Sequence, residues 1–275
     1  MANVGPAAAA VVVYNVACGD SITCRNLAEM NRPGLQVLIY DNSTRDFGNE
    51  AYCRERGWVY LGGSGNAGIS KAYNACVDYL KTRGVEGLLC LFDDDTAVSE
   101  EYFTALEQAA AQAEEKIFVP LIRSGGRLMS PCRLTAEHRV RIFGSEQEAL
   151  EYRGSDLSAI NSCMAIDLRV FDDFRYDENI FLDGVDHHFT RQMHTRGIGI
   201  RVIGYGCDHA FSGDSKPPVN SALNRFRIYA KDYGYILRDN KPAYWKLVGK
   251  RAVSLCLKYR TFGFLRNITS YVNWS

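Results

Sequence analysis

The feature that most constrains the fold of this chain is a regular alternation of short apolar runs and amphipathic segments over roughly its first 120 residues. The apolar runs are rich in valine, leucine and isoleucine, which predicts buried strands. The expected strands are 10–14, 37–40, 58–61, 87–92 and 117–122, and the expected helices between them are 21–30, 49–56, 69–82 and 99–116. Alternating strands and helices indicate a parallel sheet with crossover helices. We therefore predict an α/β fold with a mostly parallel central sheet flanked by helices.

Beyond residue 123 the segments become shorter, and 124–154 alternates without a clear period. The remaining pattern predicts a strand or strand pair, a helix, a further strand, a long helix rich in Arg and Tyr, and one or two amphipathic helices at the end. These expected elements are 157–168, 187–196, 198–203, 220–237 and the tail from 243.

Composition and charge exclude several classes of protein. The 275 residues are 47% apolar and 23% charged, which is ordinary for a globular chain and argues against disorder, collagen and coiled coil. Lys plus Arg equals Asp plus Glu at 32 each, so the chain lacks the basic excess of a protein that binds nucleic acid through phosphates.

Cysteines and apolar runs indicate the compartment. None of the nine cysteines forms a C-x-x-C pair, so we expect free, mostly buried thiols in a reducing cytoplasm rather than a zinc ribbon or a redox motif. No apolar run approaches the roughly 20 residues needed to span a bilayer. The N-terminal segment has no basic region before its apolar stretch, so no signal peptide is expected.

The C-terminal tail is basic. Residues 241–275 hold seven Lys and Arg and no Asp or Glu, which leaves 25 basic and 32 acidic residues, a net charge of −7, before Lys241. Aromatic and aliphatic residues alternate with these cations. Two roles are weighed equally: a helix that lies on an anionic membrane, or a helix that packs on the acidic body or on a partner subunit. Loss of membrane pelleting after deletion of 243–275 would support the first.

Three polar clusters follow expected strands, at the end of a parallel sheet where ligands bind. They are Asp41-Asn42, the glycine-rich 63–68 and Asp93-Asp94-Asp95. Three adjacent carboxylates repel one another, and a hard divalent cation such as Mg²⁺ or Mn²⁺ relieves that repulsion. The alternative for the triplet is a solvated turn that caps the next helix; we favour the metal.

The glycine-rich segment matches G-x-G-x-x-G, the dinucleotide fingerprint, and so raises an NAD(P)-dependent oxidoreductase as an alternative function. Its place in the third strand–helix unit rather than the first argues against that function. The other interpretations are a turn that permits close packing, and a loop where Asn66 and the helix N-terminus approach a phosphate or sugar.

Acidic residues and histidines also mark the second half. Asp183 and Asp186 precede a helix, where each is either a helix cap or a general base facing the crevice. His187 and His188 point to different faces of that helix, so at most one faces the site. His209 is either a hydrogen-bonding residue or a residue that faces the site.

In order and spacing these motifs resemble the family 2 glycosyltransferases of the GT-A fold, and most closely their bacterial rhamnosyltransferase-like branch. The resemblance spans about Val11 to Leu237. The segments that carry it are Val11–Asn15, Ile39–Ser43, Asn66–Asn74, Leu91–Thr96, Phe181–Asp186, and His209 with Gly213-Asp214.

The resemblance implies a role for each matching residue. Donor-binding positions are Val12, Tyr14, Asp41, Asn42, Asn66, Gly68, Lys71, Asp93 and Asp94. Asp95 corresponds to the metal carboxylate, His209 to a late metal or diphosphate contact, and Asp186 to the catalytic base. The family usually has an acidic residue, then an aromatic after the base, where this chain has His188 before Phe189. An Arg usual in that helix is displaced to Arg191, beside Gln192. Asp183, His188 and Arg191 are therefore candidates for the acceptor side.

The resemblance also implies an organisation and a reaction. Residues 1–122 would be the donor-binding half and 123–219 the acceptor and catalytic half of one GT-A domain, with 220–275 a helical, basic C-terminal extension. The reaction would be an inverting, metal-dependent single displacement that moves rhamnose from dTDP-rhamnose to a glycan or lipid-linked glycan in bacterial surface polysaccharide synthesis, such as lipopolysaccharide O-antigen. UDP-hexose or UDP-galactofuranose as donor, and a non-catalytic glycan-binding module, are the alternatives. We expect a cytoplasmic protein, and leave open both a peripheral position at the inner face of the cytoplasmic membrane and a homodimer.

Overall fold

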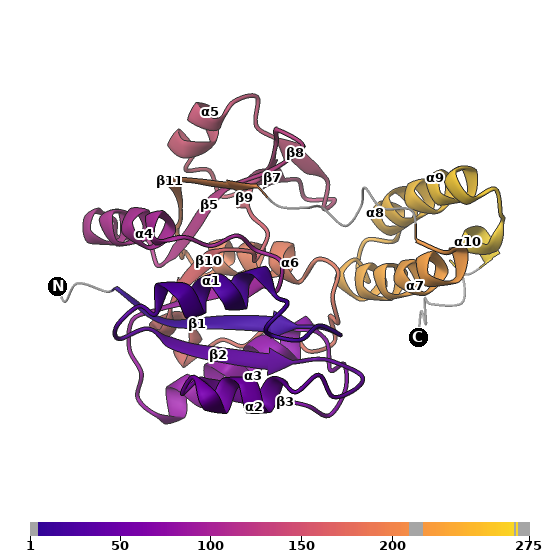
Figure 1. Cartoon of the computed structure of the whole chain (residues 1–275). Coiled ribbons are helices and arrows are strands. Elements are labelled where there is room, and N and C mark those ends of the chain that lie inside the picture. Colours follow the sequence, from indigo (N-terminus) through magenta and orange to yellow (C-terminus); the bar gives the residue numbers. More distant parts are fainter. Residues whose placement is uncertain (1–4, 209–216, 267, 269–275) are drawn as a thin grey trace.

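A central sheet of eight strands forms the middle of the molecule (Figure 1). The computed structural model describes residues 5–208, 217–266 and 268. Along the sheet the order is β11-β5-β10-β4-β1-β2-β3, and β6 pairs with β5. The strands are β1 (Pro6–Val13), β2 (Gln36–Asp41), β3 (Val59–Gly62), β4 (Leu88–Asp93), β5 (Ile117–Ser124), β6 (Arg127–Ser130), β10 (Met164–Asp167) and β11 (Ile200–Asp208). The expected α/β architecture with a mostly parallel sheet is confirmed.

Helices cover both faces of this sheet, and the pleat of β1 sorts its side chains between them. Ala8, Ala10 and Val12 face a core that includes residues of α3 and α6, whereas Val11 and Val13 face a core that includes residues of α1, α2 and α4. The helices are α1 (Ile22–Met30), α2 (Asn49–Glu55), α3 (Ile69–Thr82), α4 (Glu100–Gln112) and α6 (Val185–Thr195). Burial on both faces explains why the strands are continuous apolar runs.

Strand β10 runs against the direction of its two neighbours. It pairs antiparallel with β4 through Met164 and Leu91, and antiparallel with β5 through Ala165 and Phe118. A strand from the second half of the sequence therefore separates two strands of the first half. The two halves of the sequence share one sheet.

Residues 124–172, which include the segment without a clear period, form several small elements besides β6 and β10 of the central sheet. Strands β7 (Cys132–Leu134), β8 (Val140–Ile142) and β9 (Leu157–Ser158) make a three-stranded sheet, next to α5 (Glu146–Glu151). A short 3₁₀ helix, η1 (Leu168–Asp172), follows β10. Strands of two to four residues carry too little alternation to be recognised from sequence.

The C-terminal helices form a unit with its own apolar core, to the right of the sheet in Figure 1. Phe226, Tyr244 and Phe264 are fully buried in it or nearly so. Its elements are α7 (Val219–Ile236), α8 (Lys241–Tyr244), the π-helical turn η3 (Trp245–Gly249), α9 (Lys250–Tyr259) and α10 (Gly263–Arg266). The expected helical extension is confirmed.

All nine cysteines are free and buried, as the sequence predicted. Within the described ranges, no helix has both the length and the apolar character that a membrane span requires.

Candidate active site

The ends of β1 and β2 build a buried polar corner. The backbone N–H of Asn42 donates to the Val13 carbonyl at 2.9 Å. The Asp41 carboxylate is buried and accepts from the Ser43 backbone N–H at 2.9 Å, the Asn49 side-chain amide at 2.9 Å and the Tyr60 hydroxyl at 3.2 Å. Burial and then the Asp41 charge raise the pKa of Tyr60 to about 12. Asp41 is thus fixed in one orientation before any ligand arrives.

Asp41 and Tyr60 also line an open cavity of about 750 Å³. Its walls come from β2 and β3, from the segments that follow them and from α2, and most of the lining residues are polar. They are Asp41, Ser43–Asp46, Gly48, Glu50, Ala51, Arg54, Tyr60 and Gly62–Gly65. Volume and hydrogen-bonding side chains suit a nucleoside-sized ligand.

The glycine loop belongs to this cavity at the edge of the sheet. β3 is the last strand on its side, whereas the order of strands reverses between β1 and β4. A dinucleotide fingerprint follows the first strand, at that reversal. The position of residues 63–68 therefore argues against the oxidoreductase.

The aspartate triplet forms a turn at the end of β4, next to β1. Val12 pairs with Asp93 in the sheet register. The hydroxyl of Thr23 donates to the Asp93 carbonyl at 2.5 Å, and that of Ser21 to the Asp94 carbonyl at 2.6 Å. The start of α1 thereby fixes the backbone of the turn.

The three carboxylates differ in environment. Asp94 accepts from the Tyr14 backbone N–H at 3.3 Å, while Asp95 is exposed. Burial raises the pKa of Asp94 to about 6; the Tyr14 N–H opposes that shift, and the charges of Asp95 and Asp93 add to it. The Asp94 side chain thus connects the aspartate turn to the residue that follows β1.

The turn offers oxygen ligands to a cation, but no complete cage. Among the described residues, no group of three His, Cys, Asp or Glu side chains has the geometry to hold a metal. Mg²⁺ and Mn²⁺ at phosphate sites take one or two protein carboxylates and complete their shell with water and phosphate oxygens. Asp93 and Asp95 fit a cation of that kind, bound together with a diphosphate.

Asp186 lies in the first turn of α6, and its Oδ1 accepts from the His187 backbone N–H at 2.7 Å. No donor from the described part of the chain reaches Oδ2. The link to the aspartate turn is the buried ring of Tyr73 on α3, whose pKa is raised first by burial and then by the charges of Asp93, Tyr176 and Asp186. The charges of Asp93, at the end of β4, and of Asp186, at the start of α6, therefore both act on this ring.

Helix α3 holds one side of the segment that leads to Asp186. The Ser70 hydroxyl donates to the Ile180 carbonyl at 2.6 Å, and the Ile69 N–H to the Phe181 carbonyl at 2.8 Å. The Asn74 side chain bonds both backbone groups of Tyr176, each at 2.9 Å. The stretch from Asn66 to Asn74 therefore supports the segment before Asp186.

Helix α7 holds the other side through Asp232. This carboxylate is fully buried and accepts the backbone N–H groups of Phe181, Leu182 and Asp183 at 3.0, 2.9 and 2.8 Å. Burial raises the pKa of Asp232, against the three amides that lower it. Segment 176–183 is thereby clamped between α3 and α7.

Two glycines permit this close packing. Gly68, before α3, has a φ of +88°, and a Cβ there would lie 2.7 Å from the Phe181 ring. Gly184, before α6, has a φ of +77°, and a Cβ would lie 3.0 Å from Ile236 of α7. Any larger residue would push the segment away from its clamp.

The remaining donor-side residues surround these clusters. Val12 is buried under the sheet edge, whereas Tyr14 is half exposed. Asn42 holds the glycine loop because its amide bonds the Ala67 N–H at 3.0 Å and the Gly68 carbonyl at 3.3 Å. Asn66 caps the Gly68 N–H at 3.1 Å, and Lys71 is exposed in the first turn of α3.

The three acceptor-side candidates have different surroundings. Asp183 pairs with Arg225 of α7 through both guanidinium arms. Arg191 points to the small sheet, where it donates to the Thr135 carbonyl at 2.8 Å and to His138 Nε2 at 2.6 Å. His188 is half-buried, and burial lowers its pKa. His209, Gly213 and Asp214 lie outside the described residues.

The Arg191–His138 contact predicts a dependence of stability on pH. Burial, and then the charges of Arg191 and two histidines, lower the pKa of His138 to about 3. When the pH is below the ordinary histidine pKa of about 6.5, His138 is protonated in the unfolded chain but stays neutral in the folded chain. The free energy of unfolding therefore decreases as the pH falls. At about pH 5 this loss is about 2 kcal/mol.

We expect the His138→Asn variant to lose less stability than the parent between about pH 7 and pH 5. Asparagine tolerates the left-handed backbone of this residue, whose φ is 58°. Denaturant unfolding of both proteins at the two pH values measures the difference. Equal losses would show that His138 does not titrate in this way.

Several residues that sequence reasoning missed support the site. Asp232, Ser70 and Asn74 hold the segment before Asp186. Asn161 lies just before β10, beside the aspartate turn, and its buried Oδ1 has no hydrogen-bond partner among the described residues. Ser70 and Asn74 lie within the segment 66–74 that carries the resemblance, but no local pattern predicts their hydrogen bonds, because the partners are distant in the sequence.

Comparisons with known proteins agree with this architecture. No family model and no curated protein matches the chain. Among solved structures, S. aureus TarS 1–349 has a TM-score of 0.50 at 14% identity, covering 84% of this chain and 65% of that one. Its complex with UDP-GlcNAc also gives 0.50 at 14% identity, covering 82% and 65%. This chain therefore spans a little under two thirds of the TarS fragment.

Glucosyl-3-phosphoglycerate synthase from Mycobacterium tuberculosis, solved with Mn²⁺, UDP and glucosyl-3-phosphoglycerate, is also similar. Its TM-score is 0.56 at 13% identity, and the match covers 85% of this chain and 79% of that chain. At such identities the likeness shows the fold alone. It confirms the GT-A-type fold that the sequence motifs predicted.

Proposed function

We propose that this protein is a glycosyltransferase that moves a sugar from a nucleoside-diphosphate donor to an acceptor hydroxyl. The observation that carries the proposal is that hydrogen bonds connect the polar corner after β2 to the segment before Asp186: Asn42 bonds Gly68, and the next residue, Ile69, bonds Phe181. The charges of Asp93 and Asp186 also both act on the buried Tyr73, and the nucleoside-sized cavity lies beside Asp41. Such a transfer needs carboxylates that hold a divalent cation for the diphosphate, and another carboxylate that accepts the proton of the acceptor hydroxyl. The solved structures with UDP and UDP-GlcNAc share the fold and support this class of ligand.

The cavity beside Asp41 would bind the nucleoside, and the diphosphate would extend toward the aspartate turn. The glycine-rich loop is held by Asn42, which accepts the Ala67 N–H, and by Asn66, which accepts the Gly68 N–H. Lys71, exposed in the first turn of α3, would face the diphosphate. Asp93 and Asp95 would hold a Mg²⁺ or Mn²⁺ ion, which supplies positive charge to the departing diphosphate.

Asp186 would act as the base. Its Oδ1 is held by the His187 N–H, and Oδ2 is available to accept the proton of the acceptor hydroxyl. As that proton moves to Asp186, the acceptor oxygen bonds to the anomeric carbon, and the bond to the diphosphate oxygen breaks with its electron pair. A single displacement of this kind inverts the anomeric centre. Asp183, paired with Arg225, would border the acceptor side without transferring protons.

The sequence motifs support a narrower choice of donor and acceptor. The first donor to test is dTDP-rhamnose, with transfer to a glycan or lipid-linked glycan in surface polysaccharide synthesis. UDP-hexoses are the second, because similar folds have been solved with UDP. A lipid-linked acceptor would place the protein in the cytoplasm at the inner face of the membrane.

A thermal-shift panel of UDP, dTDP, GDP, CMP and NAD, with and without Mn²⁺, tests the proposal. A ligand at about 100 times its Kd adds about 2.7 kcal/mol to stability. That corresponds to a rise in Tm of roughly 5–10 °C for a chain of this size. We expect such a rise with dTDP or UDP and Mn²⁺, and its loss in Asp95→Ala.

Each other outcome contradicts part of the proposal. A shift with NAD alone would favour the oxidoreductase. A shift that does not depend on Mn²⁺ would remove the metal from the proposal. Donor binding without turnover on any acceptor, unchanged by Asp186→Asn, would indicate a non-catalytic binding module.

A further inference from the structure

The C-terminal unit exposes apolar side chains that its own core does not use. Helix α9 buries Ala252 and Cys256 against the rest of the unit, while Val253 and Leu257, one turn apart, point outward. Leu257 is 76% exposed, an unusual value for a leucine in a helix. The helix is therefore apolar on two sides, and only one of them is covered.

Other exposed apolar residues precede and follow α9 in the same C-terminal unit. Trp245 is 42% exposed in η3, and Phe262 is 75% exposed just before α10. We call the set the outer apolar surface. It consists of Trp245, Val253, Leu257, Phe262 and Leu265.

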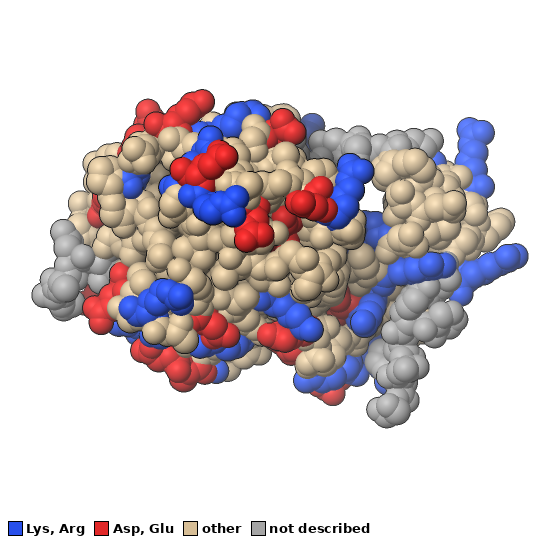
Figure 2. Space-filling model, turned by 60° about the horizontal axis from the view of Figure 1, so that its bottom comes forward, with Lys and Arg blue, Asp and Glu red and all other residues tan. Residues whose placement is uncertain are grey.

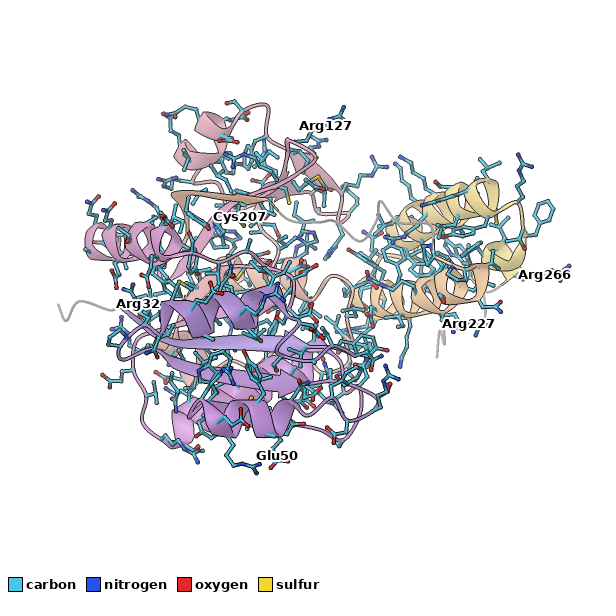
Figure 3. All side chains as sticks on the ribbon, viewed as in Figure 1. Arg32, Glu50, Arg127, Cys207, Arg227 and Arg266 are labelled. Atoms are coloured by element: carbon cyan, nitrogen blue, oxygen red, sulfur yellow. The ribbon has the colours of Figure 1, made fainter. Side chains whose placement is uncertain are left out.

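Positive charge surrounds the outer apolar surface. Lys246, Lys250 and Lys258 are exposed on η3 and α9, and the segment from Lys241 to Ser275 contains no acidic residue. Figure 2 shows Lys and Arg side chains projecting from this unit. Arg266 projects from the end of the unit farthest from the sheet (Figure 3). Exposed apolar groups framed by lysines fit a surface that offers both hydrocarbon and negative charge.

We propose that the outer apolar surface docks on an anionic lipid bilayer. Trp245 and Phe262 would enter the interface between headgroups and acyl chains, and Lys246 and Lys250 would contact anionic headgroups. A second copy of this chain fits less well, because a two-fold contact through this surface would bring the lysines of both copies together. The acidic body of the same chain is also excluded, because Leu257 and Phe262 remain exposed while α7 to α10 pack together.

The proposal depends on this surface alone and not on the proposed sugar transfer. Because the C-terminal unit extends to one side of the sheet in Figure 1, the proposal predicts that this unit faces the bilayer and that the sheet lies farther from it. The binding energy would combine insertion of apolar side chains with attraction of the lysines, so it would weaken with salt.

Flotation of the full-length protein with lipid vesicles tests it. Vesicles of phosphatidylcholine alone are compared with an equal mixture of phosphatidylcholine and phosphatidylglycerol. We expect binding to the mixed vesicles only, weakened at high salt. Two double variants, Leu257→Asp with Phe262→Asp and Lys246→Glu with Lys250→Glu, should each lower the partition coefficient by about tenfold or more.

Matched controls place the same changes on the body of the protein. Val140→Asp with Ile142→Asp adds two carboxylates at exposed apolar residues of β8, and Arg139→Glu with Arg141→Glu makes the same change in net charge as the lysine pair. Both controls should bind vesicles as the parent does. Circular dichroism confirms that each variant is folded.

Three results would overturn the proposal. Equal binding to neutral vesicles would show that anionic lipid is not the partner. Unchanged vesicle binding in both double variants of the C-terminal unit would show that the protein contacts the bilayer through another surface. No vesicle binding by the parent, together with a dimer on size exclusion that Leu257→Asp with Phe262→Asp dissociates, would show that the surface joins two copies of the chain.

Discussion

Asp186→Asn is expected to lower kcat for sugar transfer by about 10²–10⁴-fold, because an amide cannot take the proton of the acceptor hydroxyl. The variant keeps the shape of the side chain at the start of α6 and can still accept the His187 N–H. Donor affinity should therefore stay within about twofold of the parent value. Initial rates with saturating donor, together with a donor titration, separate the two quantities.

Asp173→Asn is the matched control. That carboxylate is 80% exposed, pairs with Arg196 on the surface and lies outside the site, so its loss makes the same change in charge without touching the reaction. Its kcat should equal that of the parent. Turnover retained by Asp186→Asn would remove Asp186 as the base, whichever sugar is transferred.

Asp232→Ala is expected to lower kcat by about 10²-fold and to destabilise the fold by about 2–4 kcal/mol. The substitution removes the acceptor of three consecutive amide N–H groups, at Phe181, Leu182 and Asp183. Those amides would turn toward water, and the turn that starts α6 would move with them. For Asp232→Asn, both kcat and stability should lie between those of the parent and those of Asp232→Ala, because the amide oxygen of asparagine can still accept some of the three hydrogen bonds.

Hydrogen exchange distinguishes misplacement of the segment from general loss of stability. In Asp232→Asn, under conditions where the protein is fully folded, the amides of residues 181–183 should exchange faster while those of β1 and β4 do not. Asp239→Ala is the control, because this neighbouring carboxylate is 95% exposed. Unchanged exchange at 181–183 would show that Asp232 does not hold the segment, even if no transfer activity is found.

Sequence alone predicted the sheet because its strands are buried on both faces and their apolar runs are unmistakable. The helix expected at 69–82 matches α3 at both ends, since Gly68 marks its start. Other ends differ. The strand expected to end at Tyr40 includes Asp41, because Gly62 of β3 pairs with it. The helix expected over 99–116 ends at Gln112, and Ala113 after it is extended.

Sequence also placed the chemistry-bearing residues near strand ends, because strand ends in a parallel sheet meet at one edge. It could not identify the groups that hold them. Asp232 lies about fifty residues after the amides that it binds, and nothing in α7 distinguishes this aspartate from an ordinary surface residue. Asp232 is recognised only in the structure, where its side chain is fully buried. The roles of the individual site residues stay predictions until variants are measured.

The antiparallel strand β10 has a consequence for synthesis of the chain. When β4 leaves the ribosome, one of its edges stays without a partner until Met164 to Asp167 follow, because β10 lies between β4 and β5. During that interval the nascent chain presents an open, apolar strand edge, which is prone to pair with other chains. Fragments that end before β10 should therefore aggregate, and a pause in translation before β10 has emerged from the ribosome would be more harmful than a later one.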